Sequence, residues 1–314
     1  MATLRKWLLH SVDYLTPPVF IIVNPAAGRG SALPRLNALR AAFTERQLGG
    51  IYETTQSGDE ERVTALALAR GARTIVAVGG DGTCSRIANA VLRTANTCRL
   101  AVLPAGTGND FAKTLGVTAY GPEQIKELVS SDRTAEVDVG FADGQFFLNS
   151  CGFGFDASVL EATSRVRFLK GDAVYIYSAL QQLFTYRGID VSPSGAQGAK
   201  RGRMLMVTVS NGRFLGGAFK IAPHASVLDG KLDACFFSDA GVVERVKLFL
   251  GALRGTHLGM PSVSSAGVRE LTLTFADKPK MEMDGELRTA RSRTVELKCI
   301  PGALSVLAAP GAPA

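Results

Sequence analysis

Short apolar runs alternate with longer stretches of helical periodicity over the first 115 residues. The short runs are rich in β-branched residues and bounded by turn residues, so they predict strands, whereas apolar residues spaced by three and four predict helices. The predicted strands lie at 19–24, 51–55, 74–79 and 99–104, and the predicted helices at about 31–47, about 59–70 and directly after residue 79. Strands that alternate with helices indicate a parallel sheet with crossover helices.

From about Val137 the pattern changes, because strand-like segments follow one another with only turn residues between them. These segments lie at 144–154, 203–212, 232–237, 268–276 and 293–299. Two predicted helices, 172–184 and 240–255, interrupt them, and 192–203 has the composition of a mobile loop. We therefore predict an α/β domain over 1–136 and a mostly β domain over 137–314. Whether the last segment returns to the first domain stays open.

Residues 1–18 predict a helical extension of the first domain. Leu4, Leu8, Val12 and Leu15 are spaced by four, four and three residues and form one face of a helix. That face either packs onto the body of the protein or lies on a membrane. The helix at 172–184 is also apolar on one face, which suits either the core or contact with lipid.

Composition narrows the class of protein. The chain has 314 residues, 46% of them hydrophobic, which favours two globular domains. Its longest apolar stretches fall far short of the roughly 20 residues that a membrane-spanning helix needs. The apolar part of 1–16 is too short for a signal peptide, so we expect a cytoplasmic protein. Five widely spaced cysteines without a C-x-x-C pair predict reduced thiols.

The charge indicates an anionic partner. The formal net charge is +7 and the isoelectric point is about 9.3. Seven basic residues lie between Ser164 and Arg203 against two acidic ones. Because no run of basic and aromatic residues is typical of a nucleic-acid-binding module, we expect no nucleic-acid partner.

Three turns rich in glycine follow predicted strands: "NPAAGRG" (24–30), "GGDGT" (79–83) and "PAGTGND" (104–110). Gly80 and Gly82 let the backbone approach a ligand, and the N-terminus of the helix that follows favours a phosphate. A carboxylate beside a phosphate is repelled unless a cation lies between them, so Asp81 predicts a metal ion, and Mg²⁺ is the usual one. Asp110 supplies a second carboxylate.

Each turn alone is also explained as a chain reversal with an aspartate that caps a helix. Three of them at the carboxyl ends of predicted parallel strands favour a ligand site. The chain has no G-x-x-x-x-G-K-[ST], and "GGDGT" lacks the G-x-G-x-x-G spacing. P-loop and dinucleotide-dependent hydride-transfer functions therefore lose their usual support.

Five motifs stand in the order and spacing of one family. They are "NPAAG" (24–28), "GGDGT" (79–83), "PAGTGNDFAKTLG" (104–116), "NGRFLGGAFKIAPHASVLDGKLD" (211–233) and "MDGE" (283–286). With them, the chain resembles the diacylglycerol kinase catalytic family from about Phe20 to Leu307, particularly its soluble bacterial lipid kinases. Sphingosine and ceramide kinases also belong to that family. NAD kinase and phosphofructokinase share a "GGDG" turn, but the whole set in this order favours lipid kinases.

The resemblance implies a Rossmann-like nucleotide-binding domain followed by a C-terminal β-sandwich domain that binds lipid. ATP would lie in the cleft between them, and Mg²⁺ would be required. The residues that the resemblance assigns to the ATP phosphates and ribose are Asn24, Gly80, Gly82, Thr83, Gly106, Thr107 and Asn109, with Thr55 a further candidate. Those that it assigns to the catalytic magnesium, directly or through water, are Asp81, Asp110 and Glu286. Asp284 matches the general base, and Asp81 is also expected to be catalytic.

"MDGE" allows two geometries. If it is extended, Asp284 and Glu286 point to the same side, because alternate residues of a strand share a face. The alternative is a hairpin turn whose acids are solvated.

Two departures from the family pattern bear on the site. Leu228 stands where many relatives have an aspartate that is linked to a structural magnesium, so a second metal site at Asp229 and Asp233 stays open. Cys84, Ser85 and Arg86 follow "GGDGT" where the family usually has an apolar residue, Asn and Glu. We expect Cys84 to be a small packed side chain rather than a reactive thiol.

We therefore expect an ATP-dependent lipid kinase that converts diacylglycerol to phosphatidic acid. A sphingoid-base or ceramide kinase is the alternative within the class. A lipid- or nucleotide-binding regulator without activity is the alternative outside it, against which intact Asp81, Asp284 and Glu286 argue. We expect the protein to associate peripherally with the inner face of the cell membrane, with 165–203 contacting anionic lipid. Whether it forms a homodimer stays open.

Overall fold

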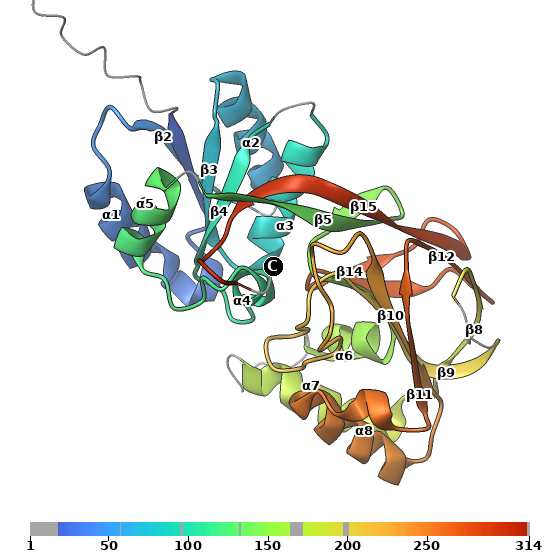
Figure 1. Ribbon diagram of the computed structural model, residues 1–314. Coiled ribbons are helices and arrows are strands. Elements are labelled where there is room, and N and C mark those ends of the chain that lie inside the picture. The colour runs from blue at the N-terminus through green and yellow to red at the C-terminus, as the bar shows by residue number, and fades with distance from the viewer. Residues whose placement is uncertain are drawn as a thin grey trace, which may run out of the picture.

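The computed structural model describes residues 18–56, 58–94, 97–131, 133–163, 172–196 and 201–312. The predicted N-terminal helix and four basic residues of the predicted membrane contact, Arg165, Arg167, Lys170 and Lys200, lie outside these ranges. The described chain forms two units joined by two long strands (Figure 1).

The first unit is an α/β layer structure. Its parallel strands are β1 (Val19–Val23), β2 (Leu48–Glu53), β3 (Thr74–Gly79) and β4 (Arg99–Pro104), in the spatial order β2-β1-β3-β4. Its helices are the 3-10 turn η1 (Ala27–Gly30), α1 (Ala32–Ala42), α2 (Asp59–Ala69), α3 (Asp81–Leu92), α4 (Asp110–Thr114) and α5 (Pro122–Ser130). α1 packs against α5 on one face of the sheet, and α2 packs against α3 on the other face (Figure 1). This is the predicted parallel sheet with crossover helices.

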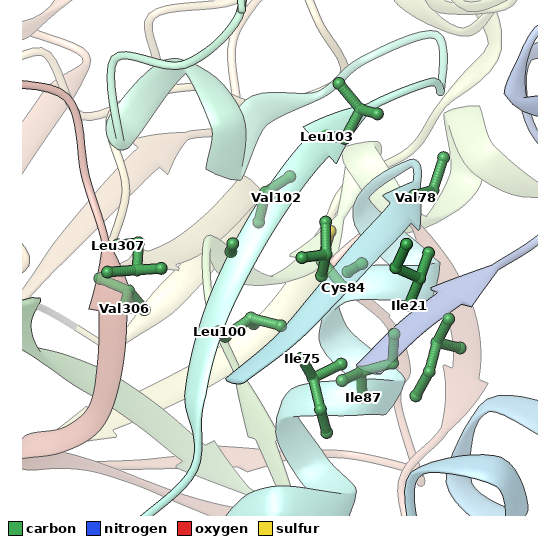
Figure 2. Close-up of a cluster of buried hydrophobic side chains, with 14 of the residues drawn as sticks. Ile21, Ile75, Val78, Cys84, Ile87, Leu100, Val102, Leu103, Val306 and Leu307 are labelled. Carbon is green, nitrogen blue, oxygen red and sulfur yellow. The ribbon is translucent and has the colours of Figure 1, made fainter. Parts of the chain in front are cut away.

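The core of this unit explains why its strands read as continuous apolar runs. Ile21, Ile75 and Leu100 lie on neighbouring strands and are fully buried, because helices cover both faces of the sheet. Ile87 and Cys84 of α3 pack onto them (Figure 2). Cys84 is therefore a packed side chain as predicted, and burial raises the pKa of its thiol well above the usual value. All five cysteines are free and buried.

The second unit is mostly antiparallel. Its strands are β6 (Gln145–Phe147), β7 (Ser150–Gly154), β8 (Ile189–Ser194), β9 (Gly202–Ser210), β10 (Leu232–Ser238), β11 (Val263–Val268), β12 (Glu270–Phe275), β13 (Lys280–Met283) and β14 (Glu286–Thr289). Its helices are α6 (Phe155–Thr163), α7 (Asp172–Thr185), α8 (Val242–Arg254) and the short η2 (His257–Gly259). α6 and α8 both contact α7 on one side of this unit (Figure 1).

Two strands connect the units. β5 (Thr134–Ala142) and β15 (Thr294–Leu307) pair antiparallel along most of their length and cross from one unit to the other (Figure 1). The first half of β15 pairs with β12, and its end pairs in parallel with β4 at Val306 and Leu100. The chain therefore finishes against the parallel sheet.

Four element predictions were wrong in detail. The helix predicted over about 31–47 ends at Ala42, and β2 begins at Leu48 rather than at 51. The segment 192–203, predicted as a loop, contains the end of β8 and the start of β9 in its described part. The strand predicted at 293–299 continues to Leu307 past an irregularity between Ile300 and Leu304.

Candidate active site

The four parallel strands end at one cavity of about 540 Å³. β1 and β3 are neighbours, and the chain leaves them in opposite lateral directions, which makes this edge a switch point where α/β sheets bind ligands. Six of the residues predicted to bind nucleotide line this nucleotide cavity: Asn24, Thr55, Gly80, Gly82, Thr83 and Gly106.

Gly80 and Gly106 bring two of the glycine turns into direct contact. A Cβ on Gly106 would lie 2.4 Å from Gly80 Cα, and a Cβ on Gly80 would lie 3.0 Å from Gly106 Cα. No other residue type fits either position without moving the backbone. The glycines therefore keep the floor of the nucleotide cavity free of side chains, beside the N-terminus of α3.

The polar residues of the nucleotide cavity are held by one another. Asn24 Nδ2 donates to Thr83 Oγ1 (3.3 Å), and Asn24 Oδ1 accepts from the main-chain N–H of Ala26 (3.0 Å). Thr55 donates from its main chain and its hydroxyl to Asp59 Oδ2 at 2.9 and 2.7 Å. The bond between Asn24 and Thr83 joins the turn at 24–30 to the turn at 79–83. The bonds from Thr55 hold the segment after β2 against the start of α2.

Thr107 and Asn109 occupy different places from the other predicted nucleotide residues. Thr107 lines a second cavity, described below. Asn109 has a left-handed backbone (φ 51°) and exchanges two hydrogen bonds with Gly106, through Nδ2 to the carbonyl (2.8 Å) and through Oδ1 from the N–H (2.9 Å). Its side chain shapes the turn.

The second cavity, of about 250 Å³, collects the predicted acidic residues. Asp81, Asp110 and Asp284 line it with Thr107 and Glu282. Asp81 begins α3, Asp110 begins α4, and Asp284 follows β13, so three segments distant in sequence converge on this carboxylate cavity.

Asp81 and Asp110 lie close enough to repel each other. Burial raises the pKa of Asp81 to about 7, and the charge of Asp110 adds to that rise. A Cβ on Gly108 would lie 3.0 Å from Asp81 Oδ2 and 3.6 Å from Asp110 Oδ2, so both oxygens border one open point. Lys113 Nζ neutralises part of this charge through Asp110 Oδ1 at 2.9 Å. The absence of a side chain at Gly108 leaves space beside Asp81 Oδ2 and Asp110 Oδ2. Two carboxylate oxygens that border one such space suit a divalent cation.

Asp284 is 3% exposed and accepts hydrogen bonds from three main-chain N–H groups. Its Oδ2 accepts from the N–H of Leu148 (2.8 Å), and its Oδ1 accepts from the N–H groups of Asn149 (2.8 Å) and Ser150 (3.2 Å). The Ser85 hydroxyl also lowers the pKa of this carboxyl. Burial raises the pKa of Asp284 above its usual value, and these bonds oppose the rise.

Glu286 lies on the other side of the hairpin. The extended geometry considered for "MDGE" is wrong, because Met283 pairs with Glu286 and the two residues between them form the turn. The solvated alternative is also wrong for Asp284, which is buried. Glu286 Oε1 pairs with Arg86 (2.6 Å) and Oε2 with Arg288 (2.8 Å), and Glu286 lines the nucleotide cavity.

Asp229 and Asp233, the residues of the open second metal site, lie outside the walls of both cavities. Burial raises the pKa of Asp233, and the charge of Asp229 adds to it. Asp138 holds the loop between them, because its Oδ2 accepts from the N–H of Gly230 (2.7 Å), and its Oδ1 accepts from the N–H of Gly302 in β15 (2.8 Å). Nowhere in the described part of the chain do three His, Cys, Asp or Glu side chains gather to hold a metal ion.

A third cavity is apolar and narrow, about 50 Å³. α7 contributes Ala179 and Leu183 to it, α8 contributes Leu248 and Phe249, and Leu215 lines both it and the carboxylate cavity. Within the described ranges no helix is long and apolar enough to cross a membrane.

The sequence analysis gave no role to four charged residues that line the cavities. Arg86 and Glu60 line the nucleotide cavity, and their side chains lie 3.5 Å apart. Glu282 lines the carboxylate cavity and Asp156 the apolar one. Arg86 follows Thr83 by three residues on a helix, a spacing that puts both on one face and indicated its position.

Comparison with known proteins supports the arrangement. Residues 18–142 match the family model of the diacylglycerol kinase catalytic domain, and 149–308 match that of the YegS C-terminal NAD kinase beta sandwich-like domain. A diacylglycerol kinase of Bacillus subtilis is 26% identical over 85% of this chain and 88% of its own. A protein of Pseudomonas aeruginosa named a probable lipid kinase YegS-like is 32% identical over 88% of this chain and 91% of its own. The crystal structure of a diacylglycerol kinase from Bacillus anthracis has the same fold, with a TM-score of 0.70 at 23% identity, over 94% of this chain and 98% of its own.

Proposed function

Because the chain belongs to the family of bacterial diacylglycerol kinases and YegS-like lipid kinases, we propose that it transfers the γ-phosphoryl group of ATP to the hydroxyl of diacylglycerol. One observation carries the proposal: a cavity with four carboxyl groups adjoins the nucleotide cavity on one side and an apolar cavity on the other. Phosphoryl transfer to a lipid needs these three environments in contact.

The nucleotide cavity suits the triphosphate. Its floor is main chain at Gly80 and Gly106, and the N-terminus of α3 directs N–H groups toward it. Asn24 and Thr83 offer polar atoms at the same edge. Arg86 supplies a positive charge for the phosphates.

Mg²⁺ fits the donor set at Asp81 and Asp110. Such an ion usually takes one or two carboxylates and completes its shell with water and phosphate oxygens, so two aspartates are sufficient. When bound, it would neutralise charge on the transferring phosphoryl group. Glu286, which pairs with Arg86, is assigned to the nucleotide cavity instead.

Asp284 is the proposed general base. It accepts hydrogen bonds from three main-chain N–H groups, which hold the carboxylate in place. The Ser85 hydroxyl also favours the ionised form of Asp284, and because this hydroxyl can rotate, a substrate hydroxyl can take its place. A lipid hydroxyl at that position would donate its proton to Asp284 as the phosphoryl group transfers.

The proposed membrane contact includes the outer face of α7. Tyr177, Leu180 and Phe184 are exposed at helical spacing there, while Ala179 and Leu183 on the inner face line the apolar cavity. Arg187 follows the same helix and suits an anionic surface. A lipid leaving the bilayer at α7 would have a short path to the apolar cavity.

The test is incubation of the purified protein with labelled ATP, Mg²⁺ and a lipid panel of diacylglycerol, ceramide and a sphingoid base, followed by identification of the product. Labelled phosphatidic acid supports the proposal. Label in ceramide or the sphingoid base alone would move the substrate to the alternative class, and ATP binding without any labelled lipid would favour a regulator.

A further inference from the structure

A row of polar side chains crosses one face of three neighbouring strands. Glu282 of β13 pairs with Gly152 of β7, and Gly152 pairs with Thr208 of β9. Directly paired residues share a face, and so do residues two apart along a strand. Ser150 and Ser210, which also pair, therefore belong to the same row.

Asp156 completes the row from α6. A Cβ on Gly152 would lie 1.5 Å from Asp156 Oδ2, so the carboxyl occupies the space that any other residue at position 152 would fill. Since Glu282 and Thr208 flank Gly152, the Asp156 carboxyl lies between them on this face. Its Oδ1 accepts from the N–H of Ala157 at 2.7 Å.

The row carries unsatisfied hydrogen-bonding capacity. Each member is at most 3% exposed, and among the described residues these atoms have no hydrogen-bond partner: Ser150 Oγ, Asp156 Oδ2, Thr208 Oγ1, Ser210 Oγ and Glu282 Oε2. Buried polar atoms are normally paired, so a cluster of them indicates a place for buried water or for the polar group of a ligand. Glu282 and Ser150 line the carboxylate cavity, whereas Asp156 lines the apolar cavity. The row thus extends from the carboxylate cavity to the apolar cavity.

The charge state of the row is set by its surroundings. Burial raises the pKa of Asp156 to about 7 and the pKa of Glu282 well above its usual value, and the charge of Asp156 adds to the second rise. Asp284 and Asp110 act on Glu282 in the same direction. Two adjacent buried carboxyls without a cation of their own keep at least one proton.

Nearby cations have other partners. Arg245 lines the apolar cavity with Asp156, but its guanidinium donates to Asp239 (2.7 Å) and to three main-chain carbonyls. Lys280, on the same strand as Glu282, pairs with Glu161 at 2.7 Å. Neither cation therefore neutralises Asp156 or Glu282. These two carboxyls keep at least one proton between them, which they can donate in a hydrogen bond to a ligand.

We propose that Glu282, supported by Asp156, determines substrate specificity by donating a hydrogen bond to an ester carbonyl of a glycerolipid acceptor. The inference rests on the proposed function and adds the feature of the substrate that is recognised. In a 1,2-diacylglycerol the free hydroxyl and the nearest ester are on adjacent carbons. Asp284 and Glu282 lie correspondingly close, since Glu282 Oε1 accepts from the N–H of Gly285 at 2.6 Å. The acyl chain of that ester would extend past Leu215 into the apolar cavity.

A comparison of two lipids tests the proposal. A diacylglycerol and a dialkyl glycerol diether of the same chain length differ in the ester carbonyls alone. The wild-type protein should use the diester with a kcat/KM roughly ten- to a hundredfold higher, the range expected for one buried hydrogen bond. Glu282→Gln keeps a hydrogen-bond donor at this position, so its kcat/KM ratio of diester to diether should stay within about threefold of the wild-type ratio. Glu282→Leu has no donor, so its turnover of the diester should fall until the two lipids are used equally. KM for ATP should not change. Glu270→Gln, on the exposed face of β12, is the matched control.

The outcomes separate this inference from the function on which it rests. Equal use of diester and diether by the wild type overturns the ester contact even if Glu282→Leu does not fold. Equal losses on both lipids in Glu282→Leu would mean a structural role and also overturn it. Loss of the preference in Glu282→Gln would mean that an ionised carboxylate is needed, which contradicts a donor. A wild type that phosphorylates neither glycerolipid contradicts the proposed diacylglycerol kinase function itself.

Discussion

Asp284 and Glu286 are separated by one glycine, yet their carboxylates line different cavities. Asp284 and Gly285 have φ values of 48° and 85°, which makes them the two central residues of a tight hairpin turn between β13 and β14. The turn directs Asp284 toward the proposed lipid hydroxyl and leaves Glu286 beside the nucleotide. One four-residue motif thus serves both substrates.

The first prediction concerns Asp284→Asn. The amide keeps the size of the side chain but cannot take the hydroxyl proton, so kcat should fall by about 10²–10⁴-fold while KM for ATP stays within about twofold. Steady-state kinetics with diacylglycerol in mixed micelles measure both. Asp143→Asn is the matched control, because Asp143 occupies an equivalent Asp-Gly turn between β5 and β6 with φ 50°. Near-normal kcat in Asp284→Asn would require another base.

The sequence allowed the α/β unit to be predicted because its strands are buried on both faces and its glycine turns follow them directly. It also predicted that Asp81 and Asp110 come together, since both follow neighbouring parallel strands. The sequence also indicated a hairpin turn at Asp284, because Asp-Gly between alternating residues is a strong hairpin signal. The burial of the Asp284 carboxyl within that turn was not predicted.

Contacts between distant segments were not predictable in this way. Arg86 and Glu286 are 200 positions apart, and no local pattern indicates that they pair. Likewise, Glu282 and Asp156 become neighbours only because β13 pairs with β7 in a particular register and Gly152 leaves room. The extent of β15 depends on β5 and β4, which precede it by more than 150 residues.

The second prediction concerns Arg86. Arg86→Gln leaves Glu60 without its cation and Glu286 with Arg288 alone at the edge of the nucleotide cavity. The uncompensated carboxylates should repel the triphosphate and raise KM for ATP about tenfold, which corresponds to about 1.4 kcal/mol. Removing one of them in Arg86→Gln/Glu286→Gln should recover part of that loss. Arg288→Gln is the control, because Arg288 also pairs with Glu286 but does not line the cavity. Additive losses in the double variant would contradict this coupling.

The third prediction concerns the metal. Excess EDTA should abolish activity, and Mg²⁺ should restore it. Asp81→Asn should lower kcat by at least about 10²-fold and raise the Mg²⁺ concentration needed for half-maximal activity, because a bound cation contributes several kcal/mol to phosphoryl transfer. Asp229→Asn is the control, because Asp229 lines neither the nucleotide nor the carboxylate cavity. This variant should keep the Mg²⁺ dependence of the wild type. Wild-type Mg²⁺ dependence in Asp81→Asn would remove Asp81 from the metal site.

The fourth prediction concerns stability. The pKa of Asp156 is raised from 3.8 to about 7 in the folded protein, mainly by burial. Between these values the folded state holds a proton that the unfolded state has lost, so Asp156 makes the folded state progressively less stable as pH rises from about 4 to about 7. Asp156→Asn cannot ionise. Its free energy of unfolding relative to wild type should therefore increase across that window, by roughly 4 kcal/mol at most. Urea unfolding at pH 4.5 and 7.5 measures it, and a constant difference would contradict the raised pKa.

The fifth prediction concerns the membrane. Tyr177, Leu180 and Phe184 are 40%, 42% and 65% exposed on one face of α7, and burying a large apolar side chain in lipid contributes about 1.5–3 kcal/mol. Phe184→Glu should therefore weaken binding to anionic vesicles by about tenfold or more, as measured by co-sedimentation. The same variant should phosphorylate a short-chain, water-soluble diacylglycerol normally, because Phe184 does not line the apolar cavity. Leu66→Glu, which changes a comparably exposed leucine on α2, should leave vesicle binding unchanged. If Phe184→Glu and Leu66→Glu weaken binding equally, added negative charge explains the loss and α7 is not the contact.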